Sequence, residues 1–343
     1  MTRLAEHTTL RLGGPARRLV DVEHEDELVE LVDKCDRADE PVLILGGGSN
    51  LVVADEGFAG TVIRVRTAGI TVQSDDTCSG ATVRVAAGEN WDDLVQTAIA
   101  NGWVGIEALS GIPGLVGAAP MQNIGAYGQE LADTVAQVRA YDRVERSIRT
   151  LALADCGFGY RSSRFKREPG RWLLLEAVFG FRLGDTSAPV RYAELARRLG
   201  IEPGERAPAT EVREAVLQLR SGKGMVLDAA DHDTWSAGSF FTNPIVPSAV
   251  AERLPADAPR WPQPGGSDLV KTSAAFLIER AGFSRGYGDG TVRLSSKHTL
   301  ALTNRGGART EELLVLAREV RDGVRSAFGI ELEPEPTLVN CAL

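Results

Sequence analysis

The feature that most constrains this chain is the glycine-rich stretch 110–128, SGIPGLVGAAPMQNIGAYG, which carries almost no charge. Glycine lets the backbone approach a partner closely, and exposed N–H groups on such turns form nests for anions. Pro113 and Pro120 fix their φ angles, which indicates an extended wall rather than a flexible linker. A second turn, GGGSN at 46–50, follows the short apolar run 41–45. We expect the long stretch to hold a ligand such as a pyrophosphate, whereas GGGSN alone fits a structural turn equally well.

Two common nucleotide-binding fingerprints are missing. Leu51 stands where the last glycine of GxGxxG would fall after the 41–45 run, and no GxxxxGK[ST] occurs in the sequence. A dinucleotide site of the Rossmann type and a P-loop are therefore disfavoured, and with them a flavin-free Rossmann dehydrogenase. A dinucleotide held by a different fold remains open.

Composition limits the class of protein. The chain has 343 residues, enough for two or three domains, and its net charge of −9 argues against a nucleic-acid binder. The four cysteines are far apart, which favours reduced thiols over disulfides or a metal site. No apolar run approaches the ~18 residues of a membrane span, and the start resembles no signal peptide, so we expect a cytoplasmic protein that does not bind membranes. We also expect a monomer.

Hydrophobic periodicity alternates between strand and helix. It predicts strands at 16–22, 41–45, 61–65, 135–142, 172–183 and 298–304, and helices at 26–35, 92–102, 211–224, 268–283 and 310–329. Mixed elements with short connections indicate an α+β chain of several subdomains.

Six motifs in order resemble one enzyme family. They are GGGSN (46–50), AGENW (87–91), the 110–128 stretch, GYRSSRFK (159–166), GSFFTNP (238–244) and LEPEP (332–336). Together they resemble the UDP-N-acetylenolpyruvoylglucosamine reductases, flavoenzymes of peptidoglycan precursor synthesis with an FAD-binding module of the vanillyl-alcohol-oxidase type. Tyr192 resembles the loop tyrosine of the subclass with a complete third domain.

The resemblance implies a division of the chain. It gives a two-part FAD-binding module, with subdomain 1 at 1–70, joined by the tail 330–343, and subdomain 2 at 71–220. A smaller α+β substrate-binding domain covers 221–329.

The resemblance also implies a reaction. NADPH reduces non-covalently bound FAD, which passes the hydride to the enolpyruvyl group of UDP-N-acetylglucosamine enolpyruvate and gives UDP-N-acetylmuramate. The implied catalytic residues are Arg161 as cation, Ser239 as proton donor and Glu335 as enolate stabiliser. Periodicity cannot separate Glu335 from Glu333, and the family's order of residues selects Glu335. Family members often continue with a basic residue after LEPEV, whereas this chain has Pro336 and Thr337.

The remaining site residues follow from the same resemblance. The expected FAD contacts are Gly46, Gly47, Gly48, Ser49, Asn50, Gly88, Ser110, Gly111, Ile112, Pro113, Gly114, Gly117, Ala118, Gln122, Asn123, Gly125, Ala126 and Tyr127. The expected substrate contacts are Tyr127, Tyr160, Tyr192, Arg220, Lys223 and Asn243. Helix-end cations such as Arg220 and Lys223 are also common for purely structural reasons.

Two other functions compete with the reductase. One is an FAD-dependent alcohol or sugar oxidase of the same fold, although such enzymes often attach FAD through His or Cys, and neither lies in the two glycine motifs. The other is a non-catalytic protein that binds flavin or a nucleotide sugar. The sequence does not decide between NADPH and NADH, and His298 and Thr337 are left without an assigned role.

Overall fold

A computed structural model describes residues 2–76, 78–263 and 265–343 and divides the chain into two compact units. The larger unit contains residues 16–47 and 59–226, and the smaller unit contains 1–15, 48–58 and 227–343. The turn 46–50 therefore passes from one unit to the other after Gly47. The division into three parts that the sequence suggests is finer and stays a prediction.

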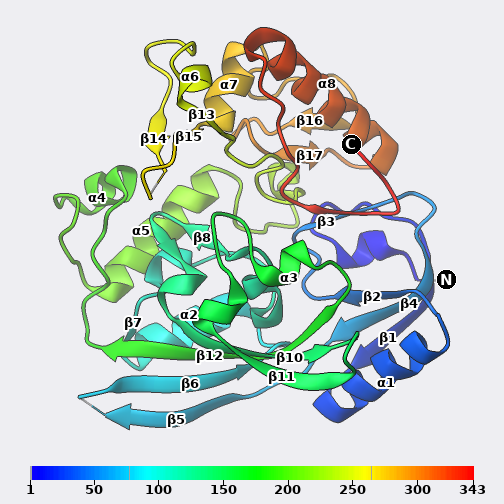
Figure 1. Ribbon diagram of the computed structural model, residues 1–343. Helices are drawn as coiled ribbons and strands as arrows, with labels where there is room; N and C mark the ends of the chain where they lie inside the picture. The colour runs from blue at the N-terminus through cyan, green and yellow to red at the C-terminus, as the bar shows by residue number, and fades with distance from the viewer. Residues whose placement is uncertain (1, 77, 264) are drawn as a thin grey trace. The chain divides into compact units, whose positions relative to one another are not determined.

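A six-stranded sheet is the main element of the larger unit (Figure 1). Its strands are β5 (Ile70–Asp76), β6 (Gly80–Ala86), β7 (Trp103–Val104), β10 (Val135–Asp142), β11 (Ser147–Ala152) and β12 (Trp172–Leu183). They run in the order β11-β10-β12-β6-β5, and β7 pairs with one end of β12. The antiparallel register aligns Val138, Ala177 and Val85 in one buried row. Apolar residues at alternate positions therefore supply one face of the core.

The larger unit also contains a separate, three-stranded sheet. Its order is β1 (Ala16–Val22), β4 (Phe58–Val65) and β2 (Val42–Leu45), with β2 parallel to β4. Helix α1 (Glu25–Arg37) buries Leu28, Val32 and Cys35, a stripe at helical spacing.

Short elements and helices complete the larger unit. The 3₁₀ segments are η2 (Glu107–Leu109), η3 (Val116–Gln122), η4 (Leu131–Asp133) and η5 (Leu153–Cys156), and β8 (Gly125–Ala126) pairs with β9 (Gln129–Glu130). The helices are α2 (Trp91–Ala100), α3 (Arg164–Arg167), α4 (Ala193–Leu199) and α5 (Ala209–Gly222).

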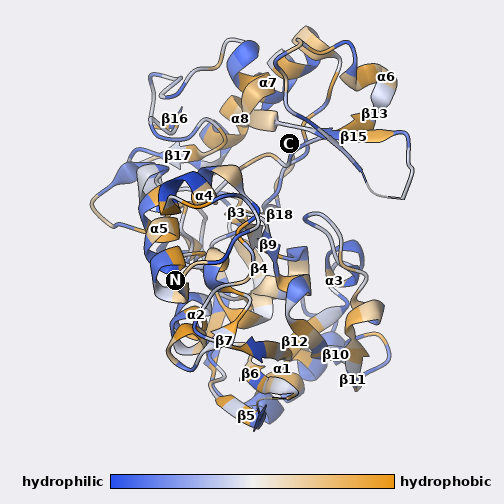
Figure 2. Ribbon diagram, turned by 90° about the vertical axis from the view of Figure 1, so that its left-hand side faces the viewer, coloured by the Kyte–Doolittle hydropathy of each residue, from blue (hydrophilic) through white to orange (hydrophobic). Residues whose placement is uncertain are grey.

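The described part of the smaller unit contains three α-helices and three small sheets. Its elements are η1 (Leu4–His7), β3 (Leu51–Val53), η6 (His232–Thr234), β13 (Ile245–Pro247), α6 (Ser248–Ala251), β14 (Arg260–Pro262), β15 (Leu269–Thr272), α7 (Ala274–Arg280), β16 (Val292–Leu294), β17 (Leu302–Asn304), α8 (Thr310–Phe328) and β18 (Thr337–Val339). Figure 2 shows hydrophobic residues along α7 and β15.

Side-chain capping fixes the start of the longest helix. Asp55 accepts hydrogen bonds from the N–H groups of Thr310 (2.9 Å) and Glu311 (3.2 Å). Gly329, with φ 68°, ends α8 in the left-handed conformation that glycine tolerates. The last strand, β18, then pairs in parallel with β3.

Most predicted elements are present, and two differ. The strands predicted at 16–22, 135–142 and 172–183 are confirmed with the same bounds. The helix predicted over 268–283 is wrong in its first part, because Leu269–Thr272 pairs with β13 and β14, and Ser273 caps a helix that begins only at Ala274. The strand predicted at 298–304 is limited to β17.

Membrane, metal and disulfide features can be stated for the described part of the chain. None of its helices is both long enough and apolar enough to cross a membrane. No three His, Cys, Asp or Glu side chains in that part group as metal ligands. All four cysteines are described, and none forms a disulfide.

The core of the larger unit offers a stability test. Phe179 is fully buried and stacks on Phe181, with ring centroids 5.4 Å apart. We expect Phe179→Ala to lower the free energy of unfolding by about 3–5 kcal/mol, because it leaves a cavity in the sheet core. The control Val72→Ala, at a side chain 47% exposed on edge strand β5, should change it by less than about 0.5 kcal/mol. Urea denaturation measures both, and equal effects would contradict this description of the core.

Candidate functional site

The two glycine segments touch each other in the larger unit. A Cβ on Gly47 would lie 2.7 Å from the Cα of Gly114, and one on Gly117 would lie 2.5 Å from the Cβ of Ala87. The N–H of Trp91 donates to the carbonyl of Gly114 (3.1 Å), and the N–H of Gly117 donates to the carbonyl of Ala87 (2.8 Å). The segments 46–47, 87–91 and 114–118 therefore form one closely packed backbone cluster, which we call the glycine cradle. Larger residues at Gly47 and Gly117 would not fit there.

Other predicted cofactor residues belong to the cradle or its borders. Gly46 faces Leu115 and Ala118, and the N–H of Gly88 donates to the hydroxyl of Thr67 (3.1 Å). Ser110 is fully buried and donates to the carbonyl of Glu107 (2.6 Å). Ile112 and Ala126 pack against the sheet core. Pro113 and Gln122 are half-buried in the same stretch.

Three non-glycine residues adopt left-handed backbone angles at one place. They are Asn123 (φ 47°), Tyr127 (φ 48°) and Arg161 (φ 49°). Each such residue costs about 1–3 kcal/mol and persists only when its surroundings hold it. Asn123 is buried, donates to the carboxylate of Glu130 (2.8 Å) and accepts from the N–H of Ala132 (2.9 Å). Strain of this kind is typical of functional sites.

Arg161 reaches the end of the glycine-rich stretch. Gly159 and Ser162 exchange backbone hydrogen bonds of 3.0 and 3.1 Å, which places Tyr160 and Arg161 at the tip of a tight turn. The Nη2 atom of Arg161 donates to the carbonyl of Gly125 (2.8 Å), and its guanidinium lies 5.8 Å from the ring centroid of Tyr160. The structure thus joins Arg161, Tyr160 and Gly125, which the sequence had predicted separately.

Four of the predicted substrate contacts also gather in the larger unit. The rings of Tyr127 and Tyr192 meet edge to face with centroids 5.5 Å apart. The Nζ atom of Lys223 lies 5.6 Å from the Tyr127 ring and 2.6 Å from the carboxylate of Glu194. Burial raises the pKa of Tyr127 to about 12, so its hydroxyl stays protonated at neutral pH.

Arg220 is the fourth member of this group. Its Nη2 atom donates to the carbonyl of Met225 (2.9 Å), while its buried Nε atom has no hydrogen-bond partner among the residues described. Burial lowers the pKa of Arg220 to about 10, and the charge of Arg161 adds to that effect. The guanidinium remains charged at neutral pH, so these two cations suit an anionic ligand.

Sequence reasoning missed two residues that hold this region together. Asp92, on α2, accepts from the N–H of Gly111 (2.6 Å) and forms a two-point ion pair with Arg213 of α5 (2.7 and 2.8 Å). An acid in the first turn of a helix is commonplace, and a contact 121 residues apart leaves no local signal. Glu107 was also missed. It is fully buried and accepts from the N–H of Gly105 (2.8 Å) and the amide of Gln129 (2.9 Å).

The smaller unit brings Ser239 and Glu335 onto neighbouring backbone segments. The N–H of Glu335 donates to the carbonyl of Phe240 (2.8 Å), and the N–H of Thr242 donates to the carbonyl of Glu333 (3.0 Å). Phe240 and Phe241 are buried, and Ser239 is half-buried. Glu333 is exposed while Glu335 is half-buried, a difference that the sequence pattern could not reveal.

Asn50 lies beside the same segment. Its side-chain amide donates to the carbonyl of Glu335 (3.4 Å), and its own carbonyl accepts from the N–H of Thr337 (3.0 Å). Gly48 has φ 63° and its carbonyl accepts from Thr9 (3.1 Å). Ser49 lies between them. The second half of GGGSN thus follows the tail that carries Glu335.

Asn243 has a structural contact in the smaller unit. Its side-chain oxygen accepts from the N–H of Ala274 at the start of α7 (3.0 Å). Arg161 belongs to the larger unit, and Ser239, Glu335 and Asn243 belong to the smaller one.

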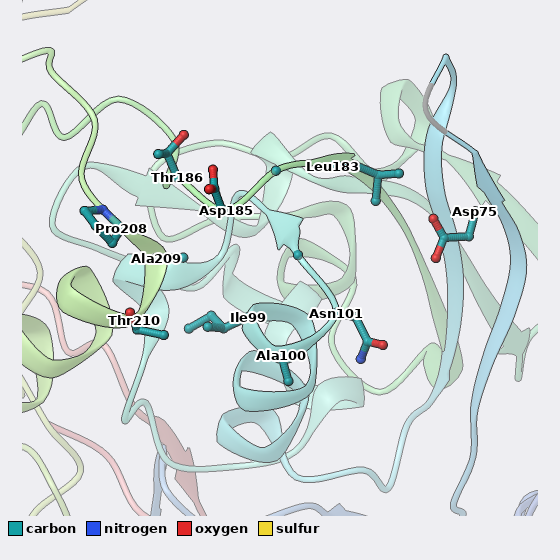
Figure 3. A pocket seen from close by; sticks show the side chains of 12 residues that line it. Asp75, Ile99, Ala100, Asn101, Leu183, Asp185, Thr186, Pro208, Ala209 and Thr210 are labelled. Atoms are coloured by element: carbon teal, nitrogen blue, oxygen red, sulfur yellow. The ribbon is translucent and has the colours of Figure 1, made fainter.

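A cavity of about 560 Å³ lies elsewhere in the larger unit (Figure 3). Its lining comes from the end of α2, the end of β12 and the start of α5, with Asp75 and Asp185 as its carboxylates. None of the predicted site residues lines it. The candidate site therefore rests on the glycine cradle and its neighbours rather than on this cavity.

Comparison with known proteins shows which family the chain belongs to. The FAD binding domain matches residues 16–150, and the C-terminal domain of UDP-N-acetylenolpyruvoylglucosamine reductase matches residues 230–339. The UDP-N-acetylenolpyruvoylglucosamine reductase of Cutibacterium acnes is 55% identical, over 99% of this chain and 90% of its own. The chain belongs to the UDP-N-acetylenolpyruvoylglucosamine reductase family.

Further members of the family cover the chain equally well. The reductase of Streptomyces avermitilis is 53% identical over 99% of this chain and 94% of its own. The crystal structure of the reductase from Thermus caldophilus is 27% identical, with a TM-score of 0.66 over 98% of this chain and 97% of its own. This UDP-N-acetylenolpyruvoylglucosamine reductase family member is therefore an FAD-dependent oxidoreductase with an α+β fold.

The residues present suit FAD. The matched FAD-binding region contains the glycine cradle, where missing side chains expose backbone to a ligand. The matched region ends at residue 150, before Arg161 and Arg220. The positive charges of these two residues suit the negative charge of a nucleotide ligand.

The cradle provides a test of cofactor binding. We expect Gly47→Ala to weaken FAD affinity roughly tenfold or more, because its methyl group would press on Gly114. The matched control is Gly180→Ala on β12, where an added Cβ meets nothing within 4 Å. The ratio of flavin to protein absorbance after purification, and the dissociation constant for FAD, measure the effect. Full FAD occupancy in Gly47→Ala would contradict this role for the cradle.

Proposed function

We propose that the chain reduces UDP-N-acetylglucosamine enolpyruvate to UDP-N-acetylmuramate with NADPH as hydride donor. The carrying observation is the clustering of Arg161, Arg220 and Lys223 around the strained end of the 110–128 stretch, which offers an anionic nucleotide sugar several cations. Family membership supports the reaction, and its mechanism below is our inference. FAD held by the glycine cradle would supply the redox chemistry, which is the transfer of a hydride between NADPH and the terminal carbon of the enolpyruvyl group.

Arg161 is proposed to hold the carboxylate of the substrate. A guanidinium is permanently charged and binds a carboxylate through two parallel N–H groups. Its side chain is oriented by a hydrogen bond to the carbonyl of Gly125 (2.8 Å). Arg161 would then stabilise the charge that develops next to the carboxylate as the hydride adds.

Ser239 is proposed to donate a proton to the carbon that bears the carboxylate. The enolpyruvyl double bond then accepts one hydride and one proton on adjacent carbons, which balances the reduction. A serine hydroxyl is a weak acid in water, and the buried Phe240 and Phe241 next to it help to exclude water. Glu335 is proposed to stabilise the enolate. It can do so only as a carboxylic acid, since an ionised carboxylate would repel the forming charge.

Tyr127, Tyr192, Arg220 and Lys223 are proposed to bind the nucleotide diphosphate. Tyr192 is 45% exposed and precedes α4, so it can cover a ligand that lies on Arg220 and Lys223. Tyr160 and Asn243 complete the proposed substrate contacts. We further propose that the protein is cytoplasmic and a monomer. Light scattering of the purified FAD-loaded protein would test the oligomeric state.

The proton donor can be tested by substitution. We expect Ser239→Ala to lower steady-state turnover by roughly 100-fold or more, the usual contribution of a general acid, while NADPH still reduces the flavin at the wild-type rate. The control Ser284→Ala, at an exposed serine in the same unit, should keep full turnover. Wild-type turnover in Ser239→Ala would remove the proposed role.

The site of protonation can be tested by labelling. In deuterated water, the product should carry solvent deuterium at the carbon bearing the carboxylate and the NADPH hydride at the methyl group. Nuclear magnetic resonance of the product distinguishes the two carbons. Absence of solvent label at the carbon bearing the carboxylate would contradict the proposed proton transfer from Ser239.

A further inference from the structure

One face of α5 lies between the 110–114 loop, proposed to bind FAD, and the cations proposed to bind the substrate. Arg213, Leu217, Arg220 and Lys223 follow one another at intervals of three or four residues, so they share one side of the helix and its end. Arg213 binds Asp92, and Lys223 reaches Tyr127. Between them, a Cβ on Gly111 would come within 3.5 Å of Leu217 and Arg220. A single rigid element thus touches both proposed ligand sites.

Asp92 is well placed to fix the loop to this helix. The side chain of Asn90 already caps α2 by accepting from the N–H groups of Asp92 (2.9 Å) and Asp93 (3.2 Å). The Asp92 carboxylate is therefore available for Gly111 and Arg213, and the side chains of the ion pair are only 26% and 14% exposed. Burial alone would raise the pKa of Asp92, but the hydrogen bonds from Arg213 and Gly111 outweigh it and lower that pKa.

Gly111 packs closely between the 110–114 loop and helix α5. It has φ 69°, and a Cβ there would lie 2.8 Å from Cδ2 of Leu217 and 3.5 Å from Nε of Arg220. A second hydrogen bond holds the residue just before the loop, because Nε1 of Trp91 donates to the carbonyl of Leu109 (3.0 Å). A displacement of Gly111 would therefore move α5 and the two cations at its end.

We propose that Asp92 and Arg213 are positioning residues that couple FAD binding to nucleotide-diphosphate binding. FAD bound against the 110–114 loop would hold Arg220 and Lys223 in place through Gly111, Asp92 and Arg213, so each ligand raises affinity for the other by the same factor. The inference rests on the proposed function only for the identity of the second ligand.

The test measures this factor in the full-length chain with UDP as probe. Calorimetry gives the dissociation constant for UDP with and without saturating FAD. We expect FAD to tighten UDP binding in the wild type by about 5-fold or more, the lower end of usual couplings. In Arg213→Gln the factor should fall to within about twofold of unity. Asp92→Asn, which keeps an acceptor for Gly111 but loses the charge, should reduce it as well.

A matched control separates coupling from general stability. Arg171 forms a similar two-point ion pair with the buried Asp142 (3.0 and 2.7 Å), and neither residue belongs to the loop or to α5. Arg171→Gln should lower the urea midpoint much as Arg213→Gln does and leave the coupling factor at its wild-type value. In the FAD-loaded enzyme, Arg213→Gln should also raise KM for the nucleotide sugar roughly tenfold while NADPH reduces the flavin at an unchanged rate.

Four results would overturn the inference in distinguishable ways. A wild-type factor of unity, or a factor that survives in Arg213→Gln, would remove the coupling and leave the proposed function intact. Equal loss of the factor in Arg171→Gln would reduce the pair to a general structural role. Binding of FAD without any binding of UDP would remove both the inference and the proposed substrate.

Discussion

The close approach of backbone to backbone in the glycine cradle is the constraint on which the rest of the larger unit depends. A Cβ on Gly47 would lie only 2.7 Å from the Cα of Gly114, so position 47 has no room for a side chain. Main-chain hydrogen bonds hold the first half of the 110–128 stretch in place. Trp91 donates to Gly114, and Gly117 donates to Ala87. A cofactor site built from backbone in this way needs few specific side chains, which explains why glycine spacing carries so much of its signal.

Strain and burial then distinguish the end of the stretch that contacts Arg161. Asn123, Tyr127 and Arg161 hold unfavourable backbone angles close together, and Arg220 keeps a buried charge near Arg161. Groups arranged at such a cost are ready for a ligand before it binds. The smaller unit contributes a different feature, a tail that lies beside the Ser239 segment through hydrogen bonds of the main chain.

Local pattern predicted the elements well and long-range contacts poorly. Strands 16–22 and 172–183 have strong alternation or continuous apolar character, and their bounds are confirmed. Residues 269–272 were predicted as helix because their apolar residues fit either period, and only pairing with β13 and β14 makes them a strand. The Asp92–Arg213 pair depends on how α2 and α5 pack, so the residues could not be singled out from sequence. The roles of Arg161, Ser239 and Glu335 came from resemblance to a family, not from spacing.

The most direct test of the central claim is an anaerobic visible spectrum of the purified protein, first with NADPH and then with UDP-N-acetylglucosamine enolpyruvate. The purified protein should be yellow, bleach with NADPH and regain its colour when the enolpyruvyl sugar is added. A protein that bleaches but stays colourless with the sugar would contradict the proposed substrate, and a protein that neither contains nor takes up FAD would contradict the cofactor site itself.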